Sequence, residues 1–226
     1  MGRLIMPNNR IMTKHHPHDY LPATGHEALL PAYDLIARLM GFSRVYPRLI
    51  AQAELADGQR VLEIGCGTGN VIIAAKRSHP GIDAVGSDPD PKILAQAQRK
   101  AFGLSGIAFE QGYAQRLPYP DGLFDRVLSS MMLHHVGEDA KPGVAAEIFR
   151  VLRPGGRLHL MDIGGDAHMQ SGPLARMFRR NHHAAGNFGD AIPRLLDGAG
   201  FDCTQVAVQP HRLLGQLNFY QATRPA

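Results

Sequence analysis

The residues best suited to chemistry form one glycine-rich stretch, VLEIGCGTGN, which runs from Val61 to Asn70. The apolar residues around Glu63 predict a strand. Three glycines in the next five residues let the backbone turn tightly and approach a ligand without Cβ atoms in the way. A helix beginning near Asn70 would direct its first unpaired N–H groups back at the loop. The stretch therefore predicts a strand, a loop and a helix that together bind a polar or anionic group of a cofactor.

The second candidate is Asp88, which follows a predicted strand and lies nineteen residues after Gly69. A carboxylate at this place can accept hydrogen bonds from both hydroxyls of a ribose cis-diol. The alternative is that Asp88 caps the helix that begins near Pro89 and Pro91. The spacing favours the ribose role, and both roles are compatible.

The glycine spacing separates two classes of cofactor. A dinucleotide fold expects G-x-G-x-x-G, which would need glycine at position 70, where Asn70 stands. The pattern present is G-x-G-x-G, with Glu63 two places before the first glycine. This pattern resembles motif I of class I methyltransferases that use S-adenosylmethionine (SAM), and the resemblance favours SAM over a nicotinamide or flavin. A glycine-rich turn without a ligand is the plain alternative.

The composition is that of a globular protein, and we expect it to be cytoplasmic. The chain has 226 residues, of which 44% are hydrophobic and 19% charged, enough for one well-buried α/β domain. Cys66 and Cys203 are far apart in sequence and imply no disulfide. No apolar run approaches a membrane span, and no signal-peptide core is evident. The net charge of +4 comes from scattered basic residues, which disfavours nucleic acid as a partner.

The apolar periodicity predicts alternating strands and helices. The order β-α-β-α-β-α-β-α-β-α-β-β implies a mainly parallel sheet with helices on both faces. Residues 1–58 would form an N-terminal arm and helical lid, and residues 59–226 the cofactor-binding domain, as one compact unit. The expected strands are 60–64, 83–87, 107–110, 124–129, 157–163, 204–209 and 217–223; the expected helices are 25–40, 44–56, 70–76, 92–102, 144–152 and 190–198.

Histidines are the candidate general bases. His134 and His135 follow the strand expected at 124–129, at the edge where open α/β sheets bind ligands. The alternative is that one of them packs or fixes the loop. His183 lies beside His182 in the long connection from Gly164 to Gly189, which can cover the acceptor. The three N-terminal histidines have no diagnostic ligand spacing, so we predict no metal site.

Four segments together resemble one family, the small-molecule class I SAM-dependent methyltransferases of the ubiquinone/menaquinone-methyltransferase-like group (methyltransferase type 11). The segments are VLEIGCGTGN, VGSDPD, LPYPDGLFDRVLSSMMLHHV and FRVLRPGGRLHLMDI, and they cover about residues 60–165. The resemblance implies a Rossmann-like, seven-stranded, mostly parallel sheet with one antiparallel strand and an N-terminal helical lid.

The resemblance also implies cofactor contacts along the carboxyl edge of the sheet. The positions that match contacts to the methionine part of SAM are Glu63, Gly65, Gly67 and Gly69. Those that match contacts to the ribose and adenine are Asp88, Pro89, Ala114 and Gln115, and those that pass the sulfonium are Ser130 and Met131. Tyr113 departs from the pattern, because the family often has an Asp there that accepts the adenine amino group. Adenine recognition would then use the backbone or another side chain.

We therefore expect an enzyme that transfers a methyl group from SAM to a small molecule and leaves S-adenosylhomocysteine. The acceptor would be a quinone, a phenol, a sugar or lipid-like hydroxyl, or an amine. Two distant cysteines do not fit thiol-based arsenite methylation, and SSMM at 129–132 is not the motif of DNA amino-methyltransferases. Two alternatives stay open: a SAM-fold binding protein without catalysis, and an RNA-directed methyltransferase that uses Arg176, Arg179 and Arg180. A homodimer is compatible with the sequence.

Overall fold

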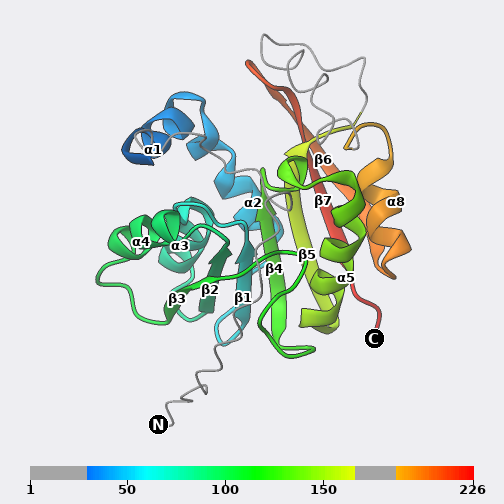
Figure 1. The fold of residues 1–226 in the computed structure, drawn as a ribbon, viewed down its shortest axis with the longest axis horizontal. Helices are drawn as coiled ribbons and strands as arrows, with labels where there is room; N and C mark the ends of the chain where they lie inside the picture. The colour runs from blue at the N-terminus through cyan, green and yellow to red at the C-terminus, as the bar shows by residue number, and fades with distance from the viewer. Residues whose placement is uncertain (1–29, 166–186) are drawn as a thin grey trace.

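The computed structural model describes residues 30–165 and 187–226 (Figure 1). No helix in these ranges is long and apolar enough to cross a bilayer. The helices are α1 (Leu30–Leu39), η2 (Phe42–Arg44), α2 (Tyr46–Gln52), α3 (Asn70–Ser78), α4 (Pro91–Lys100), η3 (Leu133–His135), η4 (Glu138–Ala140), α5 (Lys141–Val151) and α8 (Ala191–Gly198). The strands are β1 (Arg60–Ile64), β2 (Asp83–Asp88), β3 (Ile107–Gln111), β4 (Phe124–Ser130), β5 (Leu152–Ile163), β6 (Asp202–His211) and β7 (Gly215–Thr223).

The seven strands form one sheet in the order β3-β2-β1-β4-β5-β7-β6. Only β7 is antiparallel to its neighbours, β5 and β6, which confirms the predicted fold class. From β1 the chain moves outward to β2 and β3, and it then returns to β4 on the other side of β1. The loops after β1 and β4 therefore diverge at a topological switch point, where open sheets bind ligands.

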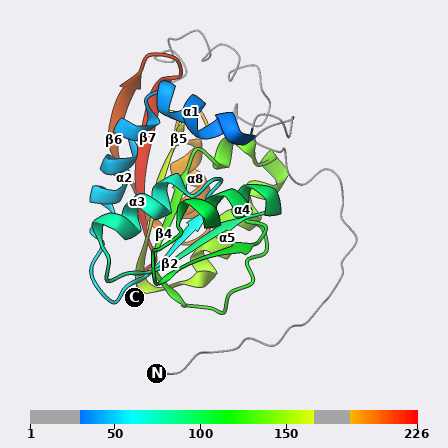
Figure 2. The ribbon, with the colours of Figure 1, turned by 90° about the vertical axis from the view of Figure 1, so that its left-hand side faces the viewer.

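Helices cover both faces of the sheet. On one face, α2 and α3 pack through Leu49, Ile50 and Ile72 against buried residues of the strands. On the other face, α5 and α8 pack through residues such as Ile148 and Leu196. Figure 2 shows α1 and the turn between β6 and β7 at the same end of the molecule. The site is thus built at one end of a sheet whose two faces are already covered.

The structure differs from three sequence predictions. No helix lies between β3 and β4, because this connection carries Pro118 and Pro120 and is anchored by buried Leu117 and Tyr119. The helix expected at 44–56 begins with the η2 turn, and α2 ends at Gln52. The segment RPGG at 153–156, expected to precede the fifth strand, lies within β5, where the pairing with β4 shifts register. The segment is held there because its glycines pair with the backbone of residue 224.

Candidate active site

Glycine is required at the three loop positions for different structural reasons. All three have positive φ, at +64° for Gly65, +52° for Gly67 and +75° for Gly69, which side chains rarely adopt. A Cβ on Gly65 would lie 2.3 Å from Cγ of Met132, and one on Gly69 would lie 2.9 Å from Cε1 of Phe109. A Cβ on Gly67 would meet nothing within 4 Å. The space beside Gly67 is therefore open, whereas at Gly65 and Gly69 the missing Cβ lets Met132 and Phe109 pack on the loop.

Asp88 joins the end of β2 to the glycine loop. Its Oδ2 accepts the backbone N–H of Gly67 at 2.9 Å, and its Oδ1 accepts that of Asp90 at 3.0 Å. Burial raises the pKa of this carboxyl, although the two backbone donors oppose the shift. The alternative that Asp88 caps α4 is wrong. The cap is Asp90, whose side chain accepts the N–H groups of Lys92 and Ile93.

The side chain of Glu63, a residue of β1, lies at the N-terminus of α3. Its Oε2 accepts the backbone N–H of Ile72 at 2.8 Å, so one of the helix donors expected to face a ligand is taken by the protein itself. Glu63 is only 2% exposed, and burial raises its pKa to about 8. The hydrogen bond from Ile72 opposes this shift, and the nearby charge of Asp88 adds to it. The strand and loop thus bring two carboxyl groups to one place with little water.

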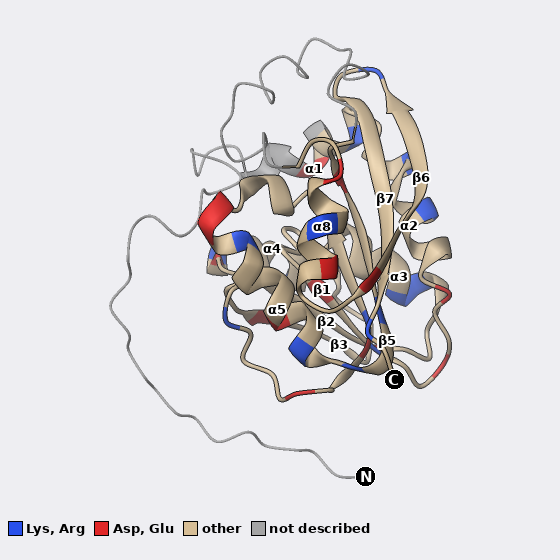
Figure 3. Ribbon diagram, turned by 90° about the vertical axis from the view of Figure 1, so that its right-hand side faces the viewer, with Lys and Arg blue, Asp and Glu red and all other residues tan. Residues whose placement is uncertain are grey.

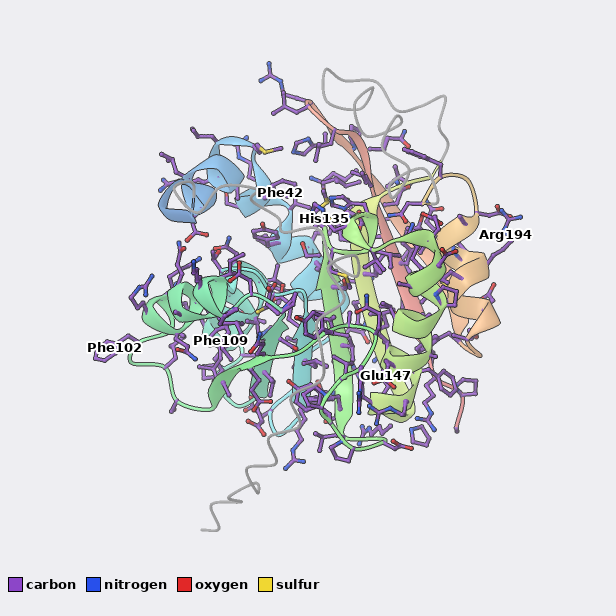
Figure 4. All side chains as sticks on the ribbon, viewed as in Figure 1. Phe42, Phe102, Phe109, His135, Glu147 and Arg194 are labelled. Atoms are coloured by element: carbon purple, nitrogen blue, oxygen red, sulfur yellow. The ribbon has the colours of Figure 1, made fainter. Side chains whose placement is uncertain are left out.

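A cavity lies over the carboxyl ends of β1, β2 and β4, and it unites most of the predicted site. Every predicted cofactor-binding residue except Gly69 lines it, and so do His134 and His135. Figure 4 shows His135 and Phe42 near this end of the sheet, far from Phe102. The lining residues that the sequence did not single out are Ala37, Met40, Phe42, Tyr46, Cys66, Thr68, Asn70, Val71, Ile93, Gly112, Met132, Val136 and Leu214.

His134 is oriented by an aspartate that the sequence did not reveal. Its Nδ1 lies 2.7 Å from Oδ1 of Asp162, near the end of β5, and the rings of His134 and His135 are 4.0 Å apart. Asp162 also accepts the backbone N–H groups of Leu133 and Ile163, at 2.8 and 2.7 Å. A carboxylate surrounded by donors is an acceptor, so Nδ1 of His134 donates its hydrogen to Asp162. In the tautomer that this bond selects, the lone pair of the ring lies on Nε2.

A second undetected aspartate, Asp34 of α1, ties the N-terminal helix to the glycine loop. Its Oδ1 accepts two hydrogen bonds, one from Oγ1 of Thr68 at 2.5 Å and one from Nδ2 of Asn70 at 3.0 Å. Its Oδ2 lies 2.8 Å from Nζ of Lys100 and 3.3 Å from Nε2 of Gln96. Burial alone would raise the pKa of Asp34, but the hydrogen bonds and the charge of Lys100 hold it below its ordinary value. One carboxylate therefore fixes α1 over the loop.

Replacing Asp34 by asparagine is expected to loosen α1. The ion pair is about a third exposed, so its loss costs roughly 1 kcal/mol, and amide hydrogen exchange across 30–39 should rise about fivefold. Glu54→Gln is the matched control, because it breaks the 2.9 Å pair with Arg157 away from α1. Unchanged exchange in α1 of the Asp34 variant, or an equal rise in the control, would contradict the assignment.

Several predicted features lie outside the described residues. They are His182 and His183, the cluster of Arg176, Arg179 and Arg180, and the N-terminal histidines. Within 30–165 and 187–226, no group of three or more His, Cys, Asp or Glu side chains is arranged to hold a metal ion. His159 is fully buried in β5, where its Nδ1 lies 3.3 Å from Nε2 of Gln52.

The sequence has clear relatives. Residues 61–156 match a family described as a methyltransferase domain. Demethylmenaquinone methyltransferase of Deinococcus radiodurans is 38% identical over 155 residues, which cover 67% of this chain and 64% of that protein. The protein of the same name from Thermus thermophilus is 36% identical over 139 residues, which cover 59% of this chain and 62% of that protein. The chain thus spans slightly less than two thirds of the length of these relatives.

Solved structures share the architecture at low sequence identity. A SAM-dependent methyltransferase from Aquifex aeolicus has a TM-score of 0.67 and 17% identity, over 89% of this chain and 100% of that chain. The [4+2]-cyclase SpnF has a TM-score of 0.68 and 20% identity, over 81% of this chain and 80% of that chain. Because one neighbour is named for a methyl transfer and the other for a cyclisation, the shared fold leaves the chemistry to be argued from the site.

Proposed function

We propose that this chain, whose residues 61–156 match a methyltransferase domain, is an enzyme that transfers a methyl group from SAM to a quinone-type ring. The observation that carries the proposal is one cavity lined by Glu63, Asp88 and His134, with His134 held by Asp162. The carboxyl groups of Glu63 and Asp88 suit a cationic cofactor, and His134 can act as a general base. Two relatives named demethylmenaquinone methyltransferase support the ring as acceptor.

The residues present fit SAM. Each Asp88 oxygen accepts one backbone N–H, which leaves further lone pairs for the two ribose hydroxyls. Glu63 supplies negative charge for the methionine end, and the open space at Gly67 lets the cofactor approach the loop. Pro89, Tyr113, Ala114 and Gln115 would hold the adenine, while Ser130 and Met131 would lie beside the sulfonium.

The acceptor would occupy the apolar end of the cavity. Met40, Phe42 and Tyr46 reach it from the N-terminal segment, and Leu214 reaches it from the β6–β7 turn. These side chains suit a flat hydrophobic ring better than a sugar. Residues 1–58 would accordingly act as the lid of a cofactor-binding unit formed by 59–226, with Asp34 holding the α1 part of the lid on the loop.

When bound, SAM would supply an activated methyl carbon, which a nucleophile attacks in line as S-adenosylhomocysteine leaves. Nε2 of His134 would take the proton of a ring hydroxyl, and Asp162 would stabilise the resulting imidazolium. Loss of that proton makes the neighbouring ring carbon nucleophilic. Once this carbon has bonded to the methyl group, it releases its own hydrogen as a proton. With His134 only 3% exposed, little water would compete for the base.

Binding of SAM should release a proton from Glu63. Because its pKa is about 8, the buried Glu63 carboxyl is protonated in most molecules at neutral pH. The cationic cofactor favours the ionised form and lowers the pKa, so binding expels the proton and becomes tighter as pH rises toward 8. Calorimetry in two buffers of different ionisation enthalpy would count the protons.

The control for this measurement is Glu63→Gln, which should abolish the release. Asp88 and Lys100 are the other charged groups that act on Glu63, and neither is altered in this variant. S-adenosylhomocysteine lacks the sulfonium charge and should release fewer protons than SAM. Identical heats in both buffers for the unaltered protein would refute the coupling.

The cofactor assignment is tested by titrating the protein with SAM, S-adenosylhomocysteine and NAD⁺. We expect the first two to bind and NAD⁺ not to bind. Absence of SAM binding would overturn the proposal. Binding without transfer to any member of a panel of quinols, phenols, sugars and amines would instead favour a SAM-fold binding protein.

A further inference from the structure

A basic groove lies beside the cavity, between the N-terminal segment and the β6–β7 turn. Arg38, Arg44 and Arg212 line it, and no acidic residue is among its described lining residues. Across the described parts of the chain, no carboxylate forms an ion pair with these three guanidinium groups. Figure 3 shows a basic residue at the tip of the β6–β7 hairpin. Within residues 30–165 and 187–226, the positive charge of the groove is therefore not neutralised by a carboxylate.

A hydrogen bond and a ring contact join the two sides of the groove, which are the N-terminal segment and the β6–β7 turn. His211 Nδ1 accepts the backbone N–H of Leu214 at 3.2 Å, so Nε2 carries the hydrogen and donates it to the carbonyl of Met40 at 2.8 Å. The ring of Phe42 stacks on His211 with centroids 5.4 Å apart. The hairpin tip and the end of α1 therefore present their arginines as one surface, although they lie about 170 residues apart in sequence.

The outer side of α1 adds apolar groups to this charge. Leu35 and Leu39 are 57% and 76% exposed, and they share a helix face with Arg38 at the spacing of one turn. Asp34 and Ala37 of the same helix contact the loop and the cavity. Leucines in water beside unpaired guanidinium groups are typical of a helix that lies at the interface of an anionic bilayer.

The cavity and the groove share a wall, because Met40 lines both. The apolar end of the cavity therefore faces the same end of the molecule as Leu39 and the arginines. A free phosphate or a nucleic acid would satisfy the arginines but would leave both leucines in water. A lipid surface would satisfy both kinds of side chain.

We propose that α1, η2 and the β6–β7 turn form a docking surface for an anionic lipid bilayer. Arg38, Arg44 and Arg212 would contact the headgroups, and Leu35 and Leu39 would enter the acyl boundary. A lipid-tailed acceptor could then pass into the cavity beside Met40. This last step rests on the proposed function, whereas the docking itself does not.

Flotation with vesicles tests the docking surface without SAM or an acceptor. The full chain should float with vesicles that contain phosphatidylglycerol, should not float with vesicles of phosphatidylcholine alone, and should be released as salt is raised. The double variant Arg38→Gln/Arg212→Gln should lower partition by about tenfold or more. Leu39→Ser should also lower it.

Two matched controls isolate this surface. Arg194→Gln removes an exposed arginine of α8, and Phe102→Ser removes an aromatic ring that is 93% exposed in the turn after α4, far from the groove (Figure 4). Both should float as well as the unaltered protein. Equal flotation with both kinds of vesicle, no flotation, or equal loss in the controls would overturn the proposal. Because SAM titration is a separate measurement, failure here would leave the proposed function standing.

Discussion

Replacing Asp88 by alanine is expected to weaken SAM binding by about 1 to 3 kcal/mol, which corresponds to roughly 5- to 150-fold. Two effects add in the same direction. The ribose would lose a charged acceptor, and the loop would lose the 2.9 Å bond that holds Gly67 N–H in place. Isothermal titration with S-adenosylhomocysteine, which is not consumed, gives the affinity directly.

Asp90→Ala is the control for this prediction. It removes the cap of α4, with a cost in stability of about 1 kcal/mol, but it leaves the Asp88 carboxylate and its two backbone donors in place. The melting temperature should fall in this variant while the cofactor affinity stays within about twofold. If Asp88→Ala binds as well as the unaltered protein, the ribose is held by other residues.

Replacing His134 by alanine is expected to lower turnover by about 10²- to 10⁴-fold, because the reaction loses its base. Cofactor affinity should change little. Asp162→Asn should also lower turnover, because an amide in place of the carboxylate no longer stabilises the imidazolium that forms when His134 takes the proton. Single-turnover kinetics, followed by release of S-adenosylhomocysteine, separate the chemical step from binding.

His135→Ala is the comparison variant. Its ring lines the cavity and lies against that of His134, whereas the Asp162 carboxylate lies at Nδ1 of His134. Its loss should lower turnover much less than loss of His134. A larger defect in the His135 variant would reassign the base. If His134→Ala instead loses stability without losing turnover, the pair with Asp162 serves to fix η3 on β5.

The sequence could predict the parts of the site that are local. Strand β1 was predicted at its true bounds, because a buried parallel strand is a short apolar run and the glycines end it. The same rule located β4 and the histidines that follow it. Asp88 was found because its distance from the glycine loop follows from one helix and one strand.

The parts that depend on long-range packing could not be predicted. Asp34 and Asp162 act on groups that lie tens of residues away, and an aspartate at the end of a strand or on a helix has many other uses. Gly65 and Gly69 are predicted as ligand contacts from their spacing, and the fold adds that Met132 and Phe109 leave no room for a Cβ at either position. Spacing shows that a glycine is needed, and only the fold shows which atom would otherwise clash.

The central claim is methyl transfer to a quinone-type ring, and one assay tests it most directly. The protein is incubated with SAM carrying a labelled methyl group and a reduced demethylmenaquinone with a short side chain, and both products are measured by mass spectrometry. We predict equal amounts of S-adenosylhomocysteine and a quinol enlarged by one labelled methyl group, and at least about a hundredfold less of both products with His134→Ala over the same time. Tight binding of SAM with no labelled quinol would contradict the account.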